Sequence, residues 1–451
     1  MRAHLAAAAR ASQSSFTEIR FERRRGTAIL QRGSEMVYAA DTESAGGVVR
    51  CYNPGCGWGV ASFRTLDDLR GALRNASESS LALRGHRAQT LPPVPSRELD
   101  LDCPAARDPS RVPLNRKIEL ASLVSRTMRG PDRRVVSTRT HYEDALHETI
   151  VVTSEGLSLR ESRSQFSLAA IAVAEEAGTV ERAAGSIASA GHWNELEEWS
   201  RTAWQIGERA VLQLHAPPVR AGRYPVVLDP ATAGLLAHRA VGHLCEADAD
   251  GPGPLPLGAR LGGDLVTIGD DGSAIGRRGT AAFDHEGMPP VPTILVQHGV
   301  VVGHVHTRMS AARVGTGPTG TARGGERKPP RARLSNTYVA SGRGDLADLL
   351  NGISVGVYVA DPVGVTLDDS RTGLRAGLAR MIRNGELAEP VKGVVLEADP
   401  LALLGLVDRV AGDFSWSTAA LSCDRGTAGT LPVSTGAPHV RLIETTVGER
   451  A

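Results

Sequence analysis

The stretch YPVVLDPATAGLLAHRAVGHLCEAD, from Tyr224 to Asp248, decides how the C-terminal half of this chain is interpreted. Its first residues are typical of a short buried strand. The pair Asp229-Pro230 then favours the start of a helix, because an aspartate side chain caps free backbone N–H groups and proline fits the first helical position. The helix that follows carries His238 and His243, five residues apart. A strand that turns directly into a histidine-bearing helix is therefore predicted here.

The five-residue spacing of the two histidines raises a geometric problem. A regular α-helix advances about 100° per residue, so His238 and His243 would point roughly 140° apart and could not bind one ion. A single π-helical turn would bring both side chains onto one face, and such turns are frequent at functional sites. Gly242 is where the helix could loosen at little steric cost. The alternative is one core and one surface histidine, with Arg239, His243 and Glu246 forming a polar stripe.

A metal interpretation of this helix requires further ligands. Two imidazoles provide half of a tetrahedral zinc site, and a catalytic site usually has a third protein ligand plus one position for water. The residue types that could supply the third ligand occur at Cys245, Glu246, His285, His304, His306 and Cys423. Spacing along the chain does not choose among them.

Bulk composition limits the classes of protein. The 451 residues suffice for two or three domains, and 51 Lys and Arg balance 50 Asp and Glu, so no global field draws the chain to nucleic acid or an anionic membrane. Five cysteines are too few for a secreted disulfide framework. The chain contains no run of 18 apolar residues, so no membrane span is predicted. We expect a soluble, cytoplasmic protein with no nucleic-acid or membrane partner.

The pattern along the chain predicts an α+β fold in two parts. Residues 16–62 alternate between apolar and polar positions, which is typical of antiparallel strands, and a helix follows from Thr65. A segment rich in Pro, Arg and Asp at about 86–116 suggests a loop or linker. We therefore predict an N-terminal α+β domain of antiparallel strands and helices over 1–215. Residues 216–451 should form a β-rich domain that contains the one metal-site helix.

Several segments together resemble the TldD subunit of the TldD/TldE (TldD/PmbA) metallopeptidases. That family's HExxxH motif, commonly HEAVGHGLE, stands here as HRAVGHLCE. Five further matches occur in the family's order and cover essentially the whole chain. They are GWGVAS at 57–62, DDGSAIGRRGTAAFDHEGMPP at 270–290, SNTYV at 335–339, EPVKGVVL at 389–396 and SCDRGTAGTLPVSTGAP at 422–438.

The resemblance implies a metal site and a partner. Carried over by position, the family's zinc ligands fall on His238, His243 and Cys423, all of which are present. Two imidazoles and a thiolate leave a fourth position on Zn²⁺ for water. The resemblance also implies pairing with a TldE/PmbA-like subunit, or failing that a homodimer, around an enclosed cavity. The expected substrate is a peptide or a peptide-like small molecule.

This chain departs from the family at the catalytic acid. Arg239 occupies the position of the family's Glu, and arginine stays protonated and cannot act as a general base. Three explanations remain open. Zinc could be kept while Glu246, Glu286 or the metal-bound hydroxide drives hydrolysis; Arg239 could clamp a substrate carboxylate; or the chain could be a non-catalytic subunit that supports a partner.

We take zinc-dependent hydrolysis with altered catalytic groups as the leading function, and tailoring in a specialised pathway as its setting. The loop from Gly315 to Arg333 carries five basic residues and one Glu between Thr321 and its end. It lacks interleaved aromatic residues, so nucleic-acid binding is not indicated. Because the resemblance places this loop near the active site, Arg323 and Arg327 are predicted to contact substrate.

Overall fold

A strongly curved sheet of seven strands forms the N-terminal half of the computed structural model, which describes residues 1–83, 90–130, 132–248, 254–368, 371–424 and 429–448. The strand order is β3-β2-β1-β5-β6-β4, with β7 paired to β6. All pairs are antiparallel except β4 with β6. The strands are β1 (Phe16–Arg32), β2 (Glu35–Asn53), β3 (Gly57–Phe63), β4 (Glu98–Leu101), β5 (Val135–Thr153), β6 (Ser158–Glu176) and β7 (Thr179–Ser189).

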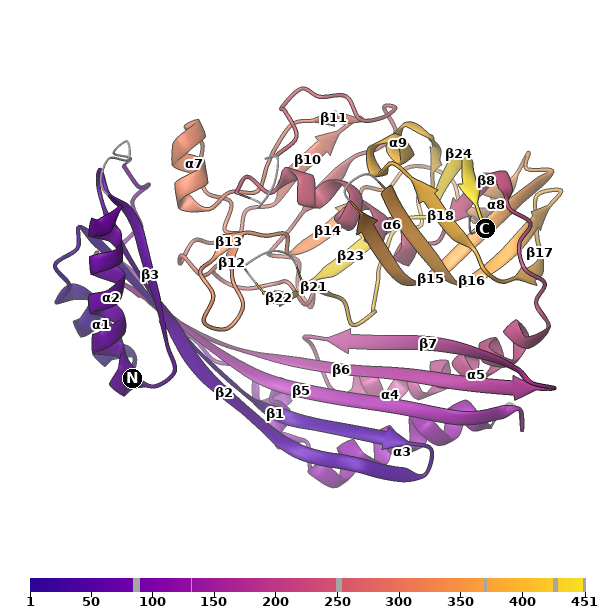
Figure 1. The fold of residues 1–451 in the computed structure, drawn as a ribbon, viewed down its shortest axis with the longest axis horizontal. Helices are drawn as coiled ribbons and strands as arrows, with labels where there is room; N and C mark the ends of the chain where they lie inside the picture. The colour runs from indigo at the N-terminus through magenta and orange to yellow at the C-terminus, as the bar shows by residue number, and fades with distance from the viewer. Residues whose placement is uncertain (84–89, 131, 249–253, 369–370, 425–428, 449–451) are drawn as a thin grey trace.

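The two faces of this sheet have different partners. Alternate residues of β1, among them Ile19, Phe21 and Ile29, are buried against helices on one face. Figure 1 shows α3, α4 and α5 beneath the sheet and the C-terminal domain within its curve. The opposite face of β1, which carries Arg20 and Glu22, therefore faces that domain. The helices are α1 (Arg2–Arg10), α2 (Leu69–Ala82), α3 (Leu114–Arg129), α4 (Asn194–Glu198) and α5 (Ser200–His215).

The segment predicted as a linker at about 86–116 contains regular structure. Residues 86–89 of that prediction lie outside the described residues. Further along, β4 pairs in parallel with the start of β6, since its ELDL sequence alternates in the way a sheet edge requires. Two short 3₁₀ turns (Ala105–Arg107 and Pro109–Arg111) then lead into α3. The segment thus extends the sheet.

The second domain, which we propose begins after α5, contains a closed ring of five strands. Pairing runs β15-β8-β24-β18-β16 and returns from β16 to β15, while β17 and β19 extend the ring at β16 and β24. Closure removes free sheet edges. The strands are β8 (Gly222–Leu228), β15 (Val355–Asp368), β16 (Arg371–Arg383), β17 (Glu386–Val391), β18 (Val395–Ala398), β19 (Val407–Val410) and β24 (Val440–Val447).

A six-stranded sheet in the order β11-β10-β9-β14-β23-β20 lies beside this ring. Its strands are β9 (Ile268–Asp270), β10 (Thr293–Gln297), β11 (Val300–Val301), β14 (Asn336–Val339), β20 (Ser415–Trp416) and β23 (Ser434–Ala437). Two hairpins join β12 (Ala322–Arg323) to β13 (Arg331–Ala332) and β21 (Ser422–Asp424) to β22 (Thr430–Pro432). The remaining helices are α6 (Pro230–Leu236), α7 (Arg308–Val314), α8 (Leu346–Leu350) and α9 (Pro400–Gly405).

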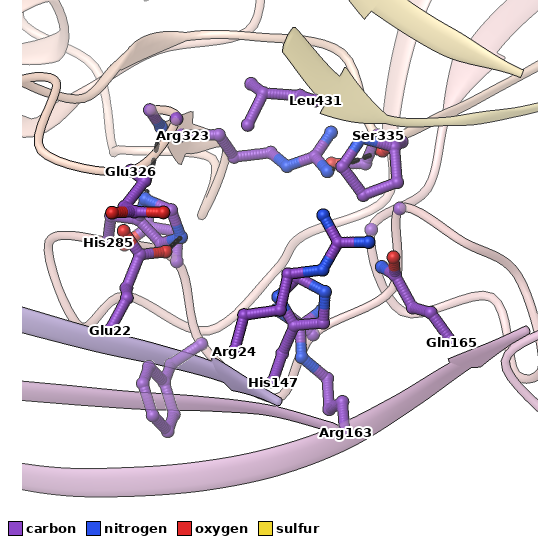
Figure 2. A pocket seen from close by; sticks show the side chains of 18 of the residues that line it. Glu22, Arg24, His147, Arg163, Gln165, His285, Arg323, Glu326, Ser335 and Leu431 are labelled. Atoms are coloured by element: carbon purple, nitrogen blue, oxygen red, sulfur yellow. Dashed lines mark hydrogen bonds and ion pairs between the residues drawn. The ribbon is translucent and has the colours of Figure 1, made fainter. Parts of the chain in front are cut away.

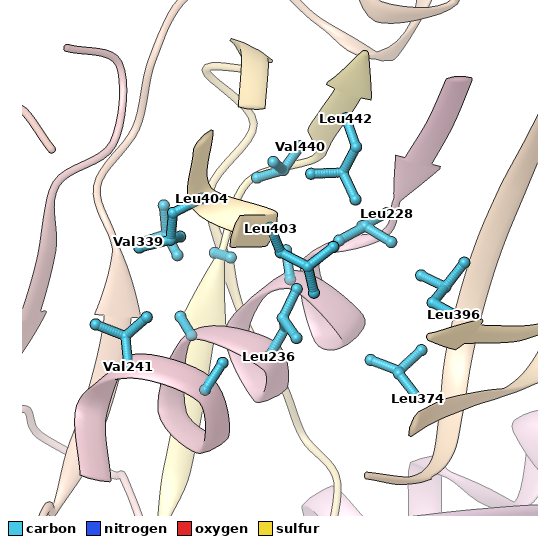
Figure 3. Packing of buried hydrophobic residues seen from close by; sticks show 14 of the residues in the cluster. Leu228, Leu236, Val241, Val339, Leu374, Leu396, Leu403, Leu404, Val440 and Leu442 are labelled. Carbon is cyan, nitrogen blue, oxygen red and sulfur yellow. The ribbon is translucent and has the colours of Figure 1, made fainter. Parts of the chain in front are cut away.

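The core of the second domain is centred on α6 and its continuation. Leu236 and Val241 on this helix pack with Leu228 of the ring, Val339 of the six-stranded sheet and Leu403 of α9, as Figure 3 shows. Burying each of these side chains contributes about 1.5–3 kcal/mol relative to exposure. The metal-site helix is therefore held on several sides by apolar packing.

This arrangement confirms the predicted α+β class, with a strand-rich C-terminal domain around one buried helix. The strands and helices of 16–82 also follow the predicted order. None of the described helices combines the length and apolar character needed to cross a membrane.

A buried ion-pair network joins the two domains. The Arg50 guanidinium lies 2.9 Å from Glu18 and 2.7 Å from Glu286 of the second domain. The other carboxylate oxygen of Glu286 accepts from the backbone N–H of Arg308. Because all three side chains are buried, each charge depends on its partners. This network fixes how the second domain sits on the curved sheet.

Replacing Arg50 by alanine should destabilise the protein strongly. Glu18 and Glu286 would then face each other without the cation between them, and breaking a buried pair in this way costs about 3–5 kcal/mol. Urea unfolding of Arg50→Ala against wild type measures the loss. Glu43→Ala is the matched control, because its pair with Arg25 is exposed and should be worth below about 1 kcal/mol. Equal losses in both variants would contradict a locking role for Arg50.

Candidate metal centre

The two histidines meet because the helix that carries them changes its winding. The Asp229 side chain caps α6 by accepting from the Thr232 backbone N–H at 2.8 Å, as the Asp-Pro pair predicts. The helix then continues as a π-helical turn over Ala237–Val241. Here the Gly242 N–H donates to the carbonyl of Ala237, five residues earlier. This turn is the distortion that the His238–His243 spacing requires.

Gly242 permits this turn for a packing reason as well. A Cβ atom added there would lie 2.5 Å from Leu334 Cδ1, which is closer than real Cβ contacts allow. The glycine thus lets the helix end approach the segment that leads into β14. Beyond it the chain tightens into a 3₁₀ turn over Gly242–Cys245. His243 is thereby directed to the same side as His238.

The structure brings His238, His243 and Cys423 together. One ligand atom from each residue lies within 4.8 Å of the other two, and all three residues are buried. The Cys423 sulfur is 3.2 Å from His243 Nε2, and the two imidazole centroids are 4.7 Å apart. Cys423 comes from β21, which is 180 residues beyond His243. The distant cysteine indicated by the family resemblance is therefore close to both histidines.

The far side of each imidazole is held by a polar partner. His238 Nδ1 is 2.8 Å from the Thr337 hydroxyl, which donates to Asp270 at 3.1 Å. His243 Nδ1 is 3.0 Å from a carboxylate oxygen of Glu246. Burial raises the pKa of Asp270 to about 7. Such outer partners fix ring orientation and make Nε2 the nitrogen of each ring that is directed toward a metal position.

The chemistry of this donor set fits zinc. His238 Nε2 is buried and has no hydrogen-bond partner among the described residues, which is costly unless a ligand occupies that direction. Burial, followed by the nearby His243, lowers the pKa of His238 well below its usual value, so its ring is neutral. Arg333 donates to the Cys423 sulfur at 3.2 Å and so orients it toward the histidines. Two imidazoles and a cysteine sulfur are typical zinc ligands.

Arg239 lies beside this group and points partly to solvent. It is half-buried, and its positive charge contributes to the lowered pKa of His238. Among the residues that the structure describes, its guanidinium has no hydrogen-bond or ion-pair partner. A cation held near a metal site without a protein partner is available to a substrate.

The two carboxylates considered as replacement bases are engaged elsewhere. One oxygen of Glu246 accepts from the backbone N–H of Leu334 at 3.3 Å in addition to its contact with His243. Glu286 belongs to the network between the domains. Within the described residues, the three-residue ligand group includes no carboxylate. Neither of these two carboxylates belongs to the ligand group in the described part of the chain.

The other candidate ligands lie outside this group in the described part of the chain. Cys245 is buried in the core, and burial raises its pKa to about 12. The ring of His285 accepts from Gly324 N–H at 3.1 Å. His304 Nε2 is 2.7 Å from the carbonyl of Leu255, and His306 Nδ1 is 3.2 Å from the Ser310 hydroxyl. Each of these residues has a structural partner that explains its position.

A cavity of about 190 Å³ lies between the curved sheet and the second domain. Figure 2 shows Arg24, His147 and Arg163 rising from the sheet, Arg323 above them, and Glu22 near His285 on the other side. Ser335 and Leu431 also line it, and Leu431 is paired with Cys423 across the β21–β22 hairpin. The cavity therefore borders the segments that carry the metal centre. Sequence reasoning missed its sheet residues because β pairing alone brings them together.

The two loop arginines predicted to contact substrate lie in different places. Arg323 lines the cavity, but its terminal nitrogens each donate at 2.6 Å to the carbonyls of Leu334 and Pro432. Burial lowers its pKa to about 10, so it remains charged near neutral pH. Arg327 is partly exposed beside Glu326 at 3.4 Å and is not among the residues that line the cavity. Arg323 therefore holds together the two segments that form the upper side of the cavity, since it donates to a carbonyl of each.

His147 predicts a specific pH dependence of stability. Burial, then the charges of Arg24 and Arg163, lowers the pKa of His147 to about 3. The unfolded chain binds the proton near pH 6.5, so the contribution of neutral His147 is complete above that value and is lost as pH falls toward 3, by up to about 1.4 kcal/mol per pH unit. Urea unfolding of wild type and His147→Gln at pH 7.5 and 5.5 tests this. Identical pH dependence in both proteins would contradict it.

Fold and donor set together define an α+β protein with a buried His₂Cys group whose chemistry suits a metal ion. Comparison with known families is more specific. The PmbA/TldA metallopeptidase C-terminal domain matches residues 221–449, the central domain matches 107–214, and domain 1 matches 17–82. The chain belongs to the PmbA/TldD metallopeptidase family.

Individual relatives agree with this assignment. A metalloprotease from Synechocystis sp. is 32% identical over 97% of this chain and 95% of its own length. A zinc metalloprotease TldD homolog from Saccharolobus solfataricus is 27% identical over 68% of this chain and 70% of its own length. The crystal structure of TldE from Thermococcus kodakarensis superposes with a TM-score of 0.76 at 16% identity, covering 97% of both chains. That last likeness shows the shared fold.

Proposed function

We propose that this chain is a zinc-dependent hydrolase of amide bonds in a peptide or peptide-like small molecule. The observation that carries the proposal is the buried His238–His243–Cys423 group with its unpartnered imidazole nitrogen. Zinc bound there would polarise the substrate carbonyl and supply a water of lowered pKa. The names of the relatives, metalloprotease and zinc metalloprotease, support the same class of reaction.

The remaining residues receive supporting roles in this proposal. Thr337 with Asp270, and Glu246 on the other ring, hold the two imidazoles in position. Glu246 is thus a positioning residue in our account, since its contact with His243 is on the side away from Cys423. Arg239 takes the role of a clamp on a substrate carboxylate. A clamp would narrow the substrate range, as expected in the tailoring of a specialised peptide-like metabolite.

One observation favours a second candidate, a non-catalytic subunit. Arg239 replaces the family's Glu, and the ligand group has no carboxylate among the described residues. Loss of a general base lowers rates by on the order of 10²–10⁴. A chain with this loss could keep its architecture while a partner carries the reaction. We rank it second because the residues at the family's three ligand positions are present and lie together.

We further propose a TldE/PmbA-like partner, with a homodimer as the alternative. The likeness in fold to TldE supports the first arrangement, since two chains of one fold can pair through equivalent surfaces. A reducing, cytoplasmic setting fits the five cysteines, all of which are unpaired.

The proposal is tested by hydrolysis assays on a mixture of unstructured peptides, read by mass spectrometry. The chain is assayed alone and with a co-expressed TldE-like subunit, after chelation and after zinc is restored. We expect zinc-dependent cleavage in at least one of these preparations. Absence of cleavage by the zinc-loaded pair would favour the non-catalytic subunit. Cleavage that persists after complete chelation would reject the zinc hydrolase.

A further inference from the structure

A row of basic side chains crosses the concave face of the N-terminal sheet. Arg24 of β1 is directly opposite His147 of β5, and His147 is directly opposite Arg163 of β6. Ser44 of β2 continues the row on the other side of Arg24. All four residues line the cavity between the sheet and the second domain. The row is visible in Figure 2, where Arg24, His147 and Arg163 form one wall.

This arrangement is costly for the protein alone. Basic residues directly opposite one another on a sheet repel. Burial, and then the neighbouring arginines, lower the pKa of His147 and keep it neutral, and the Nε2 atom of His147 is buried without a hydrogen-bond partner in the described residues. The Arg278 charge adds to this effect from the second domain. A buried ring nitrogen surrounded by three arginines favours an anion as its ligand.

The acidic residues that line the same cavity already have partners. Glu22 pairs with Arg20 at 3.2 Å, and Glu326 pairs with Arg327 at 3.4 Å. Asp284 accepts from three backbone N–H groups, those of Glu286, Met288 and Ala322. Among the described residues, Arg24 pairs with Glu143 at 3.9 Å, and Arg163 pairs with Glu161 at 3.3 Å and donates to the Thr280 carbonyl; neither of these carboxylates lines the cavity. The centre of the cavity is therefore positive.

Size and position restrict what could bind there. A volume of about 190 Å³ corresponds to about six water molecules at the liquid share of about 30 Å³ each. That space is large enough for one acidic side chain or chain end. On the upper side of the cavity, Arg323 holds the carbonyl of Leu334, whose N–H donates to Glu246 at the metal centre. The cavity thus lies beside the segment that contacts the metal centre.

We propose that Arg24, His147 and Arg163 form a subsite for a carboxylate of the substrate. The inference rests on the proposed function for its substrate class, a peptide. The carboxylate comes either from an acidic side chain or from the free C-terminus. Arg24 and Arg163 supply charge from both sides, and His147 Nε2 donates a hydrogen bond between them. The subsite would make the enzyme select acidic peptides and fix their position relative to His238 and His243.

Peptide binding without turnover tests this directly. The full chain in a Cys423→Ala background, with any co-purifying partner subunit, is titrated with three fluorescent peptides of otherwise identical sequence. One carries Gln and a C-terminal amide, one carries Glu and the amide, and one carries Gln and a free carboxylate. At least one anionic peptide should bind about tenfold or more tightly than the neutral one. If only one of the two anionic peptides binds more tightly, that peptide shows whether the carboxylate comes from the side chain or from the C-terminus.

Two variants assign the preference to the wall. Arg24→Gln and Arg163→Gln should each bring the ratio of anionic-peptide to neutral-peptide affinity close to one. The affinity for the neutral peptide should stay unchanged. Arg24 is 43% exposed, so its replacement should fold normally. Arg139→Gln is the matched control, because Arg139 is exposed on the same strand as His147 and outside the cavity, and its ratio should equal that of the parent.

Three outcomes overturn the subsite. They are equal affinity for all three peptides, no binding of either anionic peptide, and an anionic preference that survives both wall variants. A preference lost only in Arg239→Gln would belong to the clamp beside the metal. Because binding is read without hydrolysis, a chain that fails to cleave peptides could still show the selectivity. The two proposals therefore fail separately.

Discussion

Peptide hydrolysis should disappear when Cys423 is replaced by alanine, because the variant loses the sulfur ligand of the proposed metal centre. Loss of a supporting hydrogen bond alone lowers metal affinity about 10–100-fold, so loss of a ligand should exceed 100-fold. The neighbouring His243 would also lose its contact at 3.2 Å. Zinc affinity from competition with a chelating dye, measured beside the cleavage rate, checks both expectations.

Cys245→Ala is the matched control for that experiment. Cys245 is also buried and lies two residues from His243, but it packs in the apolar core and is outside the ligand group. Its replacement should lower stability modestly and leave zinc affinity unchanged. If Cys423→Ala bound zinc as tightly as Cys245→Ala does, Cys423 would not be a ligand.

Replacing Arg239 by glutamate should raise the rate of hydrolysis by on the order of 10²–10⁴, the usual worth of a general base. The change restores the family's residue beside His238 and removes a positive charge from the metal site. The same variant should lose affinity for substrates that carry a carboxylate, since the clamp becomes a repelling anion. Rate constants and KM values for matched acidic and neutral peptides separate the two effects.

Arg239→Gln separates charge from basicity in this comparison. Glutamine removes the clamp without supplying a base, so affinity for the acidic peptide should fall while the rate stays low. If Arg239→Gln raised the rate as much as Arg239→Glu does, the effect of Arg239 on the rate would come only from repulsion between its positive charge and the metal ion. Unchanged affinity in both variants would reject the clamp.

Much of the metal-site helix could be predicted from the sequence, because the residues that determine it are close together in the chain. The Asp229 cap and the need for a π-helical turn between His238 and His243 follow from side-chain chemistry and helix geometry. Cys423 is different. Nothing near residue 423 chooses it over Cys245 or His285, and only the ordered family segments indicated it. Its approach to His243 depends on how the second domain closes.

Other features depended on contacts between distant strands and were missed. β4 emerges from a segment interpreted as a linker, because its four residues become a strand only when paired with β6. The row from Arg24 through His147 to Arg163 exists only in the register of three strands. In sequence, RFERRRG is simply a charged run. Cross-strand register is set by the whole buried face, so short windows of sequence do not reveal it.

The zinc content of the purified chain tests the central claim most directly. Metal analysis of protein expressed with zinc, alone and with a co-expressed TldE-like subunit, should give close to one zinc per chain, and Cys423→Ala should give almost none. Chelation followed by zinc addition should restore the wild-type value, since the ligands are already arranged by the fold. Less than about a tenth of an equivalent, with none regained on reconstitution, would contradict a zinc centre at His238, His243 and Cys423.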